Sequence, residues 1–150
     1  MRKMTDIIYA VIDTNVLVSS VLSDKDSPSM TVVRAIRDGE IRPVFSSHLL
    51  REYRRVLTRK ELGINNRTVY ELLNLFDTPA PFGVESIDQG SSSPDMKSDP
   101  IFDMVEATRD RGTYLVTGNT ERFPSESYVL TPGQMVDKLD SAYVRHACAH

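Results

Sequence analysis

Three acidic residues that are far apart in the chain each stand beside an apolar segment. Asp13 interrupts the apolar run IIYAVIDTNVLVSSVL, Glu52 borders an apolar helical stripe, and Asp99 precedes the segment PIFDMVEA. An ionised carboxylate among apolar residues is costly unless it is paired or binds a metal. Carboxylate oxygens suit Mg²⁺ or Mn²⁺, and such a site can activate water against a phosphodiester. The three acids therefore predict a site for divalent metal chemistry.

Each of these residues also has a structural interpretation. Asp13 could cap the helix that follows it, and Asp99 before Pro100 has the residue types of a helix N-cap with proline at the first helical position. Glu52 taken alone could be a solvated helix charge. A cap and a ligand are compatible, because one carboxylate oxygen can cap while the other faces a cation. Asn119 could bind a metal or orient a water, and it could equally be a turn residue.

The elements that must position these side chains alternate between strands and helices. Short runs rich in β-branched residues predict strands at 7–12, 41–45, 113–117 and 127–130. Helical spacing and capping residues predict helices at 14–22, 27–40, 46–60, 66–76, 100–112 and 131–140. This alternation predicts an α/β/α sandwich around a mostly parallel sheet. Sites in such folds gather at the carboxyl ends of strands, so the first strand would bring Asp13 to that edge.

Length and composition fit one folded domain. The chain has 150 residues, of which 40% are hydrophobic and 26% charged, so it can form an ordinary core. We expect a single domain at 1–140, a C-terminal tail at 141–150, and a long loop at 78–99 with a short strand near 82–84. The one cysteine, Cys148, fits a reducing compartment. With no run of 18 clean apolar residues, we expect a cytoplasmic protein without a membrane span.

The segments that carry the acids resemble the PIN domain family. YAVIDTNVLVSSVL, SSHLLREYRRVL and SDPIFDMVEA occur in the family's order, followed by YLVTGN and RFP. The likeness runs from about Tyr9 to about Leu139 and is greatest to a bacterial branch described as toxins of toxin–antitoxin pairs. It implies a compact α/β/α fold and a metal-dependent endoribonuclease that uses Mg²⁺ or Mn²⁺.

The resemblance also assigns roles to particular residues. The family's acids fall on Asp13, Glu52 and Asp99, which it makes the catalytic residues and the metal ligands. Three polar residues would support them, namely Asn15, Thr117 and Asn119. Many members carry a fourth Asp where this chain has Asn119, so we expect a site of three carboxylates.

The implied substrate is RNA, either single-stranded or in an exposed loop. Because the formal net charge is -3, RNA contacts must come from a local group such as Arg51, Arg54 and Arg55, which could equally be a solvated helix face. The resemblance further implies an antitoxin partner and allows a homo-oligomer.

Two other functions compete with this prediction. The first is a weakly active or inactive PIN-fold binding domain that acts through an RNA or protein partner, which the missing fourth Asp supports. The second is an aspartyl-phosphate phosphatase, which usually needs a second Asp two positions after the first. This chain has Asn15 there, so we discount it.

Overall fold

A four-stranded, all-parallel sheet forms the centre of the protein. The computed structural model describes residues 7–24, 26–76 and 99–147, with the side chains of 142–147 excepted. The strands lie in the order β2-β1-β3-β4. They are β1 (Ile8–Ile12), β2 (Ile41–Pro43), β3 (Tyr114–Val116) and β4 (Val129–Leu130). Since every described pairing is parallel, the carboxyl ends of these strands share one edge.

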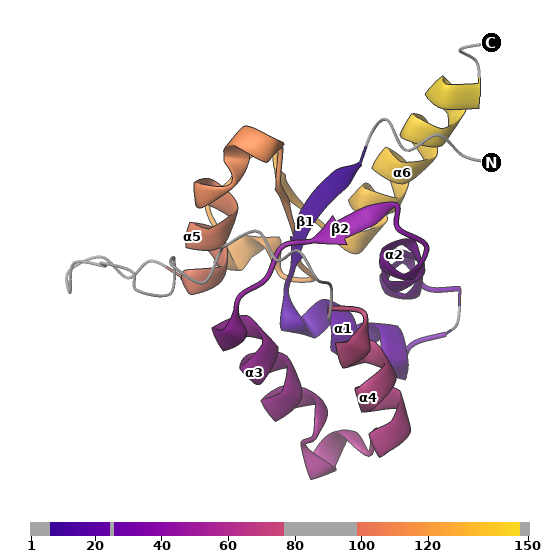
Figure 1. The fold of residues 1–150 in the computed structure, drawn as a ribbon, viewed down its shortest axis with the longest axis vertical. Coiled ribbons are helices and arrows are strands. Elements are labelled where there is room, and N and C mark those ends of the chain that lie inside the picture. Colours follow the sequence, from indigo (N-terminus) through magenta and orange to yellow (C-terminus); the bar gives the residue numbers. More distant parts are fainter. Residues whose placement is uncertain (1–6, 25, 77–98, 148–150) are drawn as a thin grey trace.

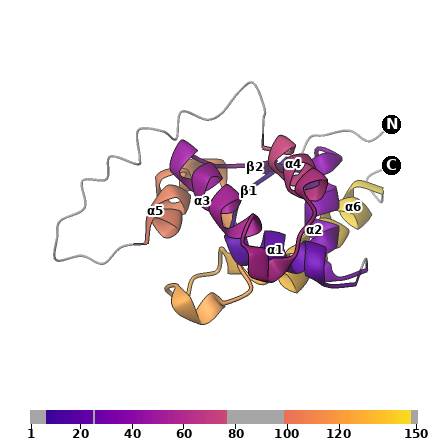
Figure 2. The ribbon, with the colours of Figure 1, turned by 90° about the horizontal axis from the view of Figure 1, so that it is seen from below.

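Helices cover both faces of this sheet. They are α1 (Thr14–Leu22), α2 (Pro28–Arg37), α3 (Ser47–Leu57), α4 (Asn66–Asn74), α5 (Pro100–Ala107) and α6 (Pro132–Ala147). Figure 1 shows α5 on one side of the sheet and α2 and α6 on the other, with α1, α3 and α4 beyond the end of β1. Figure 2 views the molecule from that end. The α/β/α architecture predicted from the sequence is confirmed.

Local capping signals fix where several helices begin. The Ser27 hydroxyl accepts a hydrogen bond from the Met30 amide, and Ser46 does the same for Leu49, as N-caps do. Before α6, the backbone N–H of Thr131 donates to the Gln134 side chain, and the Gln134 N–H donates to the Thr131 hydroxyl. This reciprocal pair is a capping box. These contacts involve residues three positions apart, so the sequence alone can indicate them.

Other element boundaries differ from the sequence-based expectation. β2 ends at Pro43 rather than at 45; it is an edge strand, the position where a sheet tolerates proline. α5 ends at Ala107 and a 3₁₀ helix, Arg109–Arg111, follows it up to Gly112 at φ +75°. α6 continues to Ala147, so residues 141–147, interpreted as part of a tail, are helical. The expected loop at 78–99 and its short strand lie outside the described residues, apart from Asp99.

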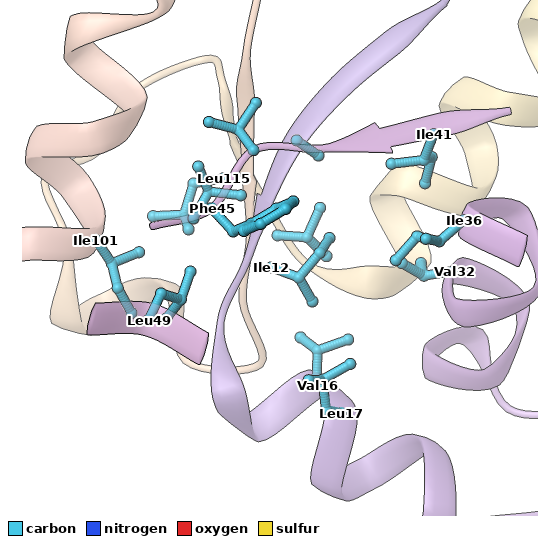
Figure 3. Packing of buried hydrophobic residues seen from close by; sticks show 14 of the residues in the cluster. Ile12, Val16, Leu17, Val32, Ile36, Ile41, Phe45, Leu49, Ile101 and Leu115 are labelled. Carbon is cyan, nitrogen blue, oxygen red and sulfur yellow. The ribbon is translucent and has the colours of Figure 1, made fainter. Parts of the chain in front are cut away.

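The core joins the sheet to its helices. Ala10, Val11 and Ile12 of β1 are completely buried, as expected for a central strand covered on both faces. Figure 3 shows Ile12 and Leu115 of the sheet among side chains from α1, α2, α3 and α5. Among the described residues, no helix is long and apolar enough to cross a bilayer.

Candidate active site

The three predicted acids line one cavity of about 620 Å³ at the end of β1. Asp13 lies between β1 and α1, Glu52 lies on α3, and Asp99 immediately precedes α5. Arg122, from the 3₁₀ helix Thr120–Arg122 that follows β3, also lines the cavity. Three segments that are distant in the sequence therefore bring Asp13, Glu52 and Asp99 to the lining of the same cavity.

The Asp13 side chain is held by other side chains rather than by the backbone of the helix that it precedes. Asp13 occupies the N-cap position of α1, but its side chain makes no capping hydrogen bond there. Its Oδ2 accepts hydrogen bonds from the Thr117 hydroxyl at 2.8 Å, from the Asn15 amide at 3.3 Å and from Arg122 Nη1 at 3.4 Å. Only 2% of the residue is exposed. The interpretation of Asp13 as a simple helix cap is therefore wrong.

The ends of β1 and β3 are tied together around Asp13. The Asp13 N–H donates to the Val116 carbonyl at 2.9 Å. Asn15 donates to Asp13 and accepts from the Gly118 N–H at 3.0 Å. A Cβ at Gly118 would stand only 3.3 Å from the Asn15 side-chain oxygen, so a glycine there allows this close approach. Asn15 and Thr117 thus support Asp13, and the Thr117 contact depends on the parallel pairing of β1 with β3.

Tyr53 fixes the backbone just before Asp13. Its ring is completely buried 4.9 Å from that of Phe76, and its hydroxyl donates to the carbonyl of Ile12. Burial raises the pKa of Tyr53 well above its ordinary value, and the nearby charge of Asp13 raises it further. The phenol therefore remains a proton donor. The sequence predicted only a helix at 46–60 that includes Tyr53; no sequence signal revealed this hydrogen bond across the fold.

Asp99 caps α5, as its sequence context indicated, and it also lines the cavity. Its Oδ1 accepts the Ile101 N–H at 2.9 Å and so caps α5. Its Oδ2 lies by the cavity, where it accepts hydrogen bonds from Nε of Arg122 at 3.1 Å and from Nη2 of the same residue. One carboxylate thus caps a helix and presents an oxygen to the site.

Arg122 is the residue that the sequence analysis missed. Its guanidinium bridges the carboxylates of Asp13 and Asp99, which are 86 positions apart in the sequence. It therefore supplies positive charge at the point where two of the three acids meet. The only sequence signal was its place in the RFP segment after β3, which gave no indication of a partner.

Glu52 lies on the cavity wall but is held differently. Both of its carboxylate oxygens accept from Arg55 Nη2, at 3.0 and 2.9 Å, one turn along α3. Three arginines were predicted to bind RNA. Among them, Arg55 is not part of the described cavity lining, but it contacts Glu52, which is. Arg51 and Arg54 are exposed and do not belong to the described lining, which includes His48 and Arg59 instead.

Asn119 is exposed and its side chain is not part of the described cavity lining. Its backbone N–H donates to the Thr117 hydroxyl at 3.1 Å, and that hydroxyl in turn donates to Asp13. Asn119 therefore contacts the site through its backbone, by way of Thr117.

The family comparison agrees with this arrangement. The PIN domain profile matches residues 9–121, three-quarters of the chain, with Asp13, Glu52 and Asp99 inside the match. The chain belongs to the PIN domain family. PIN domains are generally nucleases and typically use divalent metal ions. Neither the curated proteins nor the solved structures yield a significant match.

The donors of this PIN domain fit a hydrated Mg²⁺-type ion. Within residues 7–24, 26–76 and 99–147, no three Asp, Glu, His or Cys side chains are grouped closely enough to hold a metal. Asp13 and Asp99, however, already share one cationic group, and all three carboxylates line the cavity. Mg²⁺ usually keeps several waters and binds through one or two carboxylates. The arrangement therefore suits an open site rather than a closed cage of three acids.

Proposed function

We propose that this PIN domain is a Mg²⁺- or Mn²⁺-dependent endoribonuclease. The observation that carries the proposal is the convergence of Asp13, Glu52 and Asp99 on one cavity in a family of nucleases. Asp13 and Asp99 contact the same guanidinium, and two carboxylates that share one site favour a cation between them. A nearly buried carboxylate supported by Thr117 and Asn15 is a pre-oriented ligand, as metal sites require.

The proposed roles follow from where each residue lies. Asp13 and Asp99 would hold the metal directly, and Glu52 would hold it directly or through a water. The bound ion would supply positive charge to the phosphodiester and make a water molecule more acidic. Thr117 and Asn15 keep Asp13 facing the cavity. Glu52 can accept a hydrogen bond from a water there.

Single-stranded RNA suits this cavity better than a duplex. Beside the acids, the lining includes the apolar side chains of Val18, Leu49, Val56 and Leu62. An unstacked base can lie on such a surface while its backbone reaches the carboxylates. Arg59 lies at the same cavity, and Arg51 and Arg54 offer further positive charge on exposed positions of α3.

We propose the toxin of a toxin–antitoxin pair as the cellular role, with an antitoxin protein as its partner in the cytoplasm. The sequence likeness to the bacterial toxin branch supports this role. A homo-oligomer is part of the same proposal.

A PIN-fold binding domain that acts through RNA or protein is the second candidate. The observation that favours it is Arg122, whose guanidinium already neutralises two of the three acids.

Cleavage assays with metal and matched variants separate the two functions. Purified protein free of any partner is incubated with mixed RNA in Mn²⁺, Mg²⁺ or EDTA. Asp13→Asn is compared with Asp38→Asn, which alters an exposed acid paired with Arg37. We expect Mn²⁺-dependent cleavage by the parent and by Asp38→Asn, and none by Asp13→Asn.

Thermal unfolding in the same ions provides an independent reading. A metal at about 100 times its Kd should stabilise the parent by about 2.7 kcal/mol. A metal-dependent shift without cleavage in any ion would favour the binding domain over the nuclease. If the metal neither shifts thermal unfolding nor supports RNA cleavage, metal binding is rejected altogether.

A further inference from the structure

Arg122 occupies the meeting point of the two best-placed ligands. Its Nη1 is 3.4 Å from Asp13 Oδ2, and its Nε and Nη2 both donate to Asp99 Oδ2. A metal held by these carboxylates would compete with the guanidinium for Asp99 Oδ2, since Asp99 Oδ1 already caps α5. It would also repel the guanidinium at short range. The arginine and the ion therefore compete for one place.

The contacts of Arg122 allow it to move away. Its side chain is 44% exposed, whereas that of Asp13 is only 3% exposed, so the arginine is the partner with access to solvent. It lies at the end of the short helix Thr120–Arg122, and its guanidinium carbon is 4.8 Å from the centre of the Phe123 ring. The ring lies beside the same arginine, so the guanidinium can leave the carboxylates and keep its contact with Phe123.

A guanidinium at that edge is suited to one kind of ligand. Its planar set of donors matches the oxygens of a phosphate and can bind two of them at once. An RNA strand whose phosphate approaches the metal would bring such oxygens within reach of Arg122. In the described lining, Arg122 is the cation that contacts both Asp13 and Asp99.

We propose that Arg122 has two successive partners: it neutralises Asp13 and Asp99 in the metal-free protein, and, once a divalent ion displaces it, it binds the RNA phosphate. The second half of this proposal rests on the proposed ribonuclease function. The first half concerns only the protein and the metal. Arg122 is thus a substrate-binding residue whose release depends on the metal.

Calorimetric titration with Mn²⁺ alone tests the first half. Arg122→Ala should bind Mn²⁺ roughly tenfold more tightly than the parent, because the competing cation is gone. Arg122→Lys, which keeps the charge, should bind more weakly than Arg122→Ala. Arg37→Ala is the matched control, since Arg37 forms an exposed pair with Asp38 elsewhere. Unchanged or weaker Mn²⁺ binding by Arg122→Ala would overturn the competition; a purely structural role predicts weaker binding.

Binding of a labelled single-stranded RNA in saturating Mn²⁺ tests the second half. Stopped-flow anisotropy reads binding before any cleavage. Arg122→Ala should bind RNA about tenfold more weakly, with Arg122→Lys between it and the parent, because lysine cannot make the two-point contact. Equal RNA affinity in Arg122→Ala and the parent would overturn the phosphate contact. If no variant cuts RNA, the ribonuclease function fails, while the Mn²⁺ and RNA titrations still decide the role of Arg122.

Discussion

Asp13 and Glu52 line the same cavity, but different parts of the chain hold them. Asp13 is almost fully buried and is fixed by Thr117, 104 positions away, as well as by its neighbour Asn15. Glu52 has a side chain that is 36% exposed and pairs with Arg55, three positions along the same helix. The sheet edge therefore holds one carboxylate rigidly, while the helix wall holds the other by a single surface pair.

This contrast indicates that the two carboxylates differ in how firmly the protein holds them. A ligand held through strand pairing keeps its orientation whether or not a cation is present, because Thr117, which donates to Asp13, is completely buried. A carboxylate on an exposed helix can exchange its arginine for a water or an ion at little cost, since exposed ion pairs contribute about 0–1 kcal/mol. We expect changes near Asp13 to affect function and stability more than changes near Glu52.

The largest expected effect is the difference in RNA cleavage rate between the Asp13→Asn and Glu52→Gln variants. Asp13→Asn should lower the rate of RNA cleavage more than about 100-fold, because a fixed neutral amide cannot balance a divalent ion. Glu52→Gln should lower it about tenfold, since a hydrated ion can remain on the other two acids. Rates under single-turnover conditions in Mn²⁺ measure both. A greater loss in Glu52→Gln would reverse the contrast.

Thr117→Val tests whether the contacts behind Asp13 matter. The change keeps the shape of the side chain and removes the hydroxyl that donates to Asp13. Affinity for Mn²⁺ should fall about 10- to 100-fold, as it does when partners of a metal ligand are removed. Calorimetry compares this variant with Thr58→Val, whose hydroxyl bonds only to the backbone of α3 among its described contacts. Equal affinities in the two variants would show that Thr117 does not orient Asp13.

Tyr53→Phe should lower the free energy of unfolding by about 1–3 kcal/mol. The variant leaves the buried Ile12 carbonyl without the phenol that now donates to it. Urea unfolding compares this variant with Tyr70→Phe, because Tyr70 is 67% exposed. Loss of the Tyr70 hydroxyl should change the free energy of unfolding by less than about 0.5 kcal/mol. Similar values for the two variants would mean that this hydrogen bond contributes nothing net.

Alkaline pH should weaken the fold through the same residue. The pKa of Tyr53 is higher in the folded protein than in the unfolded chain. The protonated Tyr53 phenol therefore makes its full contribution to the free energy of unfolding below about pH 10. Above that pH, this contribution to stability is lost as the pH rises toward the pKa that Tyr53 has in the folded protein. The hydrogen bond to Glu106 similarly raises the pKa of Tyr128 to about 12. Urea midpoints from pH 8 to 11 should fall less steeply in Tyr53→Phe than in the parent; parallel slopes would exclude Tyr53 as a source.

The smallest effect should come from Arg55→Ala. This change removes the pair with Glu52 on the surface of α3. The free energy of unfolding should change by less than about 1 kcal/mol, and Mn²⁺ affinity should stay within about threefold of the parent. Urea unfolding and calorimetry provide the two readings. A loss as large as that of Tyr53→Phe would show that the helix wall is as tightly fixed as the sheet edge.

The sequence by itself determined the order of the elements, and it singled out the three acids that line the cavity. Capping residues such as Ser27, Ser46 and Thr131 act over three positions, so their effect can be predicted without the fold. The apolar run before Asp13 likewise indicated a buried strand with an acid at its carboxyl end. Parallel strands place such ends at one edge, and the resemblance to the PIN domain family grouped Glu52 and Asp99 with Asp13.

Only the tertiary structure decided what these acids contact. The pairing of β1 with β3 sets Thr117 against Asp13, and the turn after β3 brings Arg122 between Asp13 and Asp99. Tyr53 likewise reaches the Ile12 carbonyl across 41 positions. Hydrogen bonds and charge contacts act over a few ångströms in space, whatever the separation in sequence. A chain with the same local signals but a different strand order would keep its caps and lose this site.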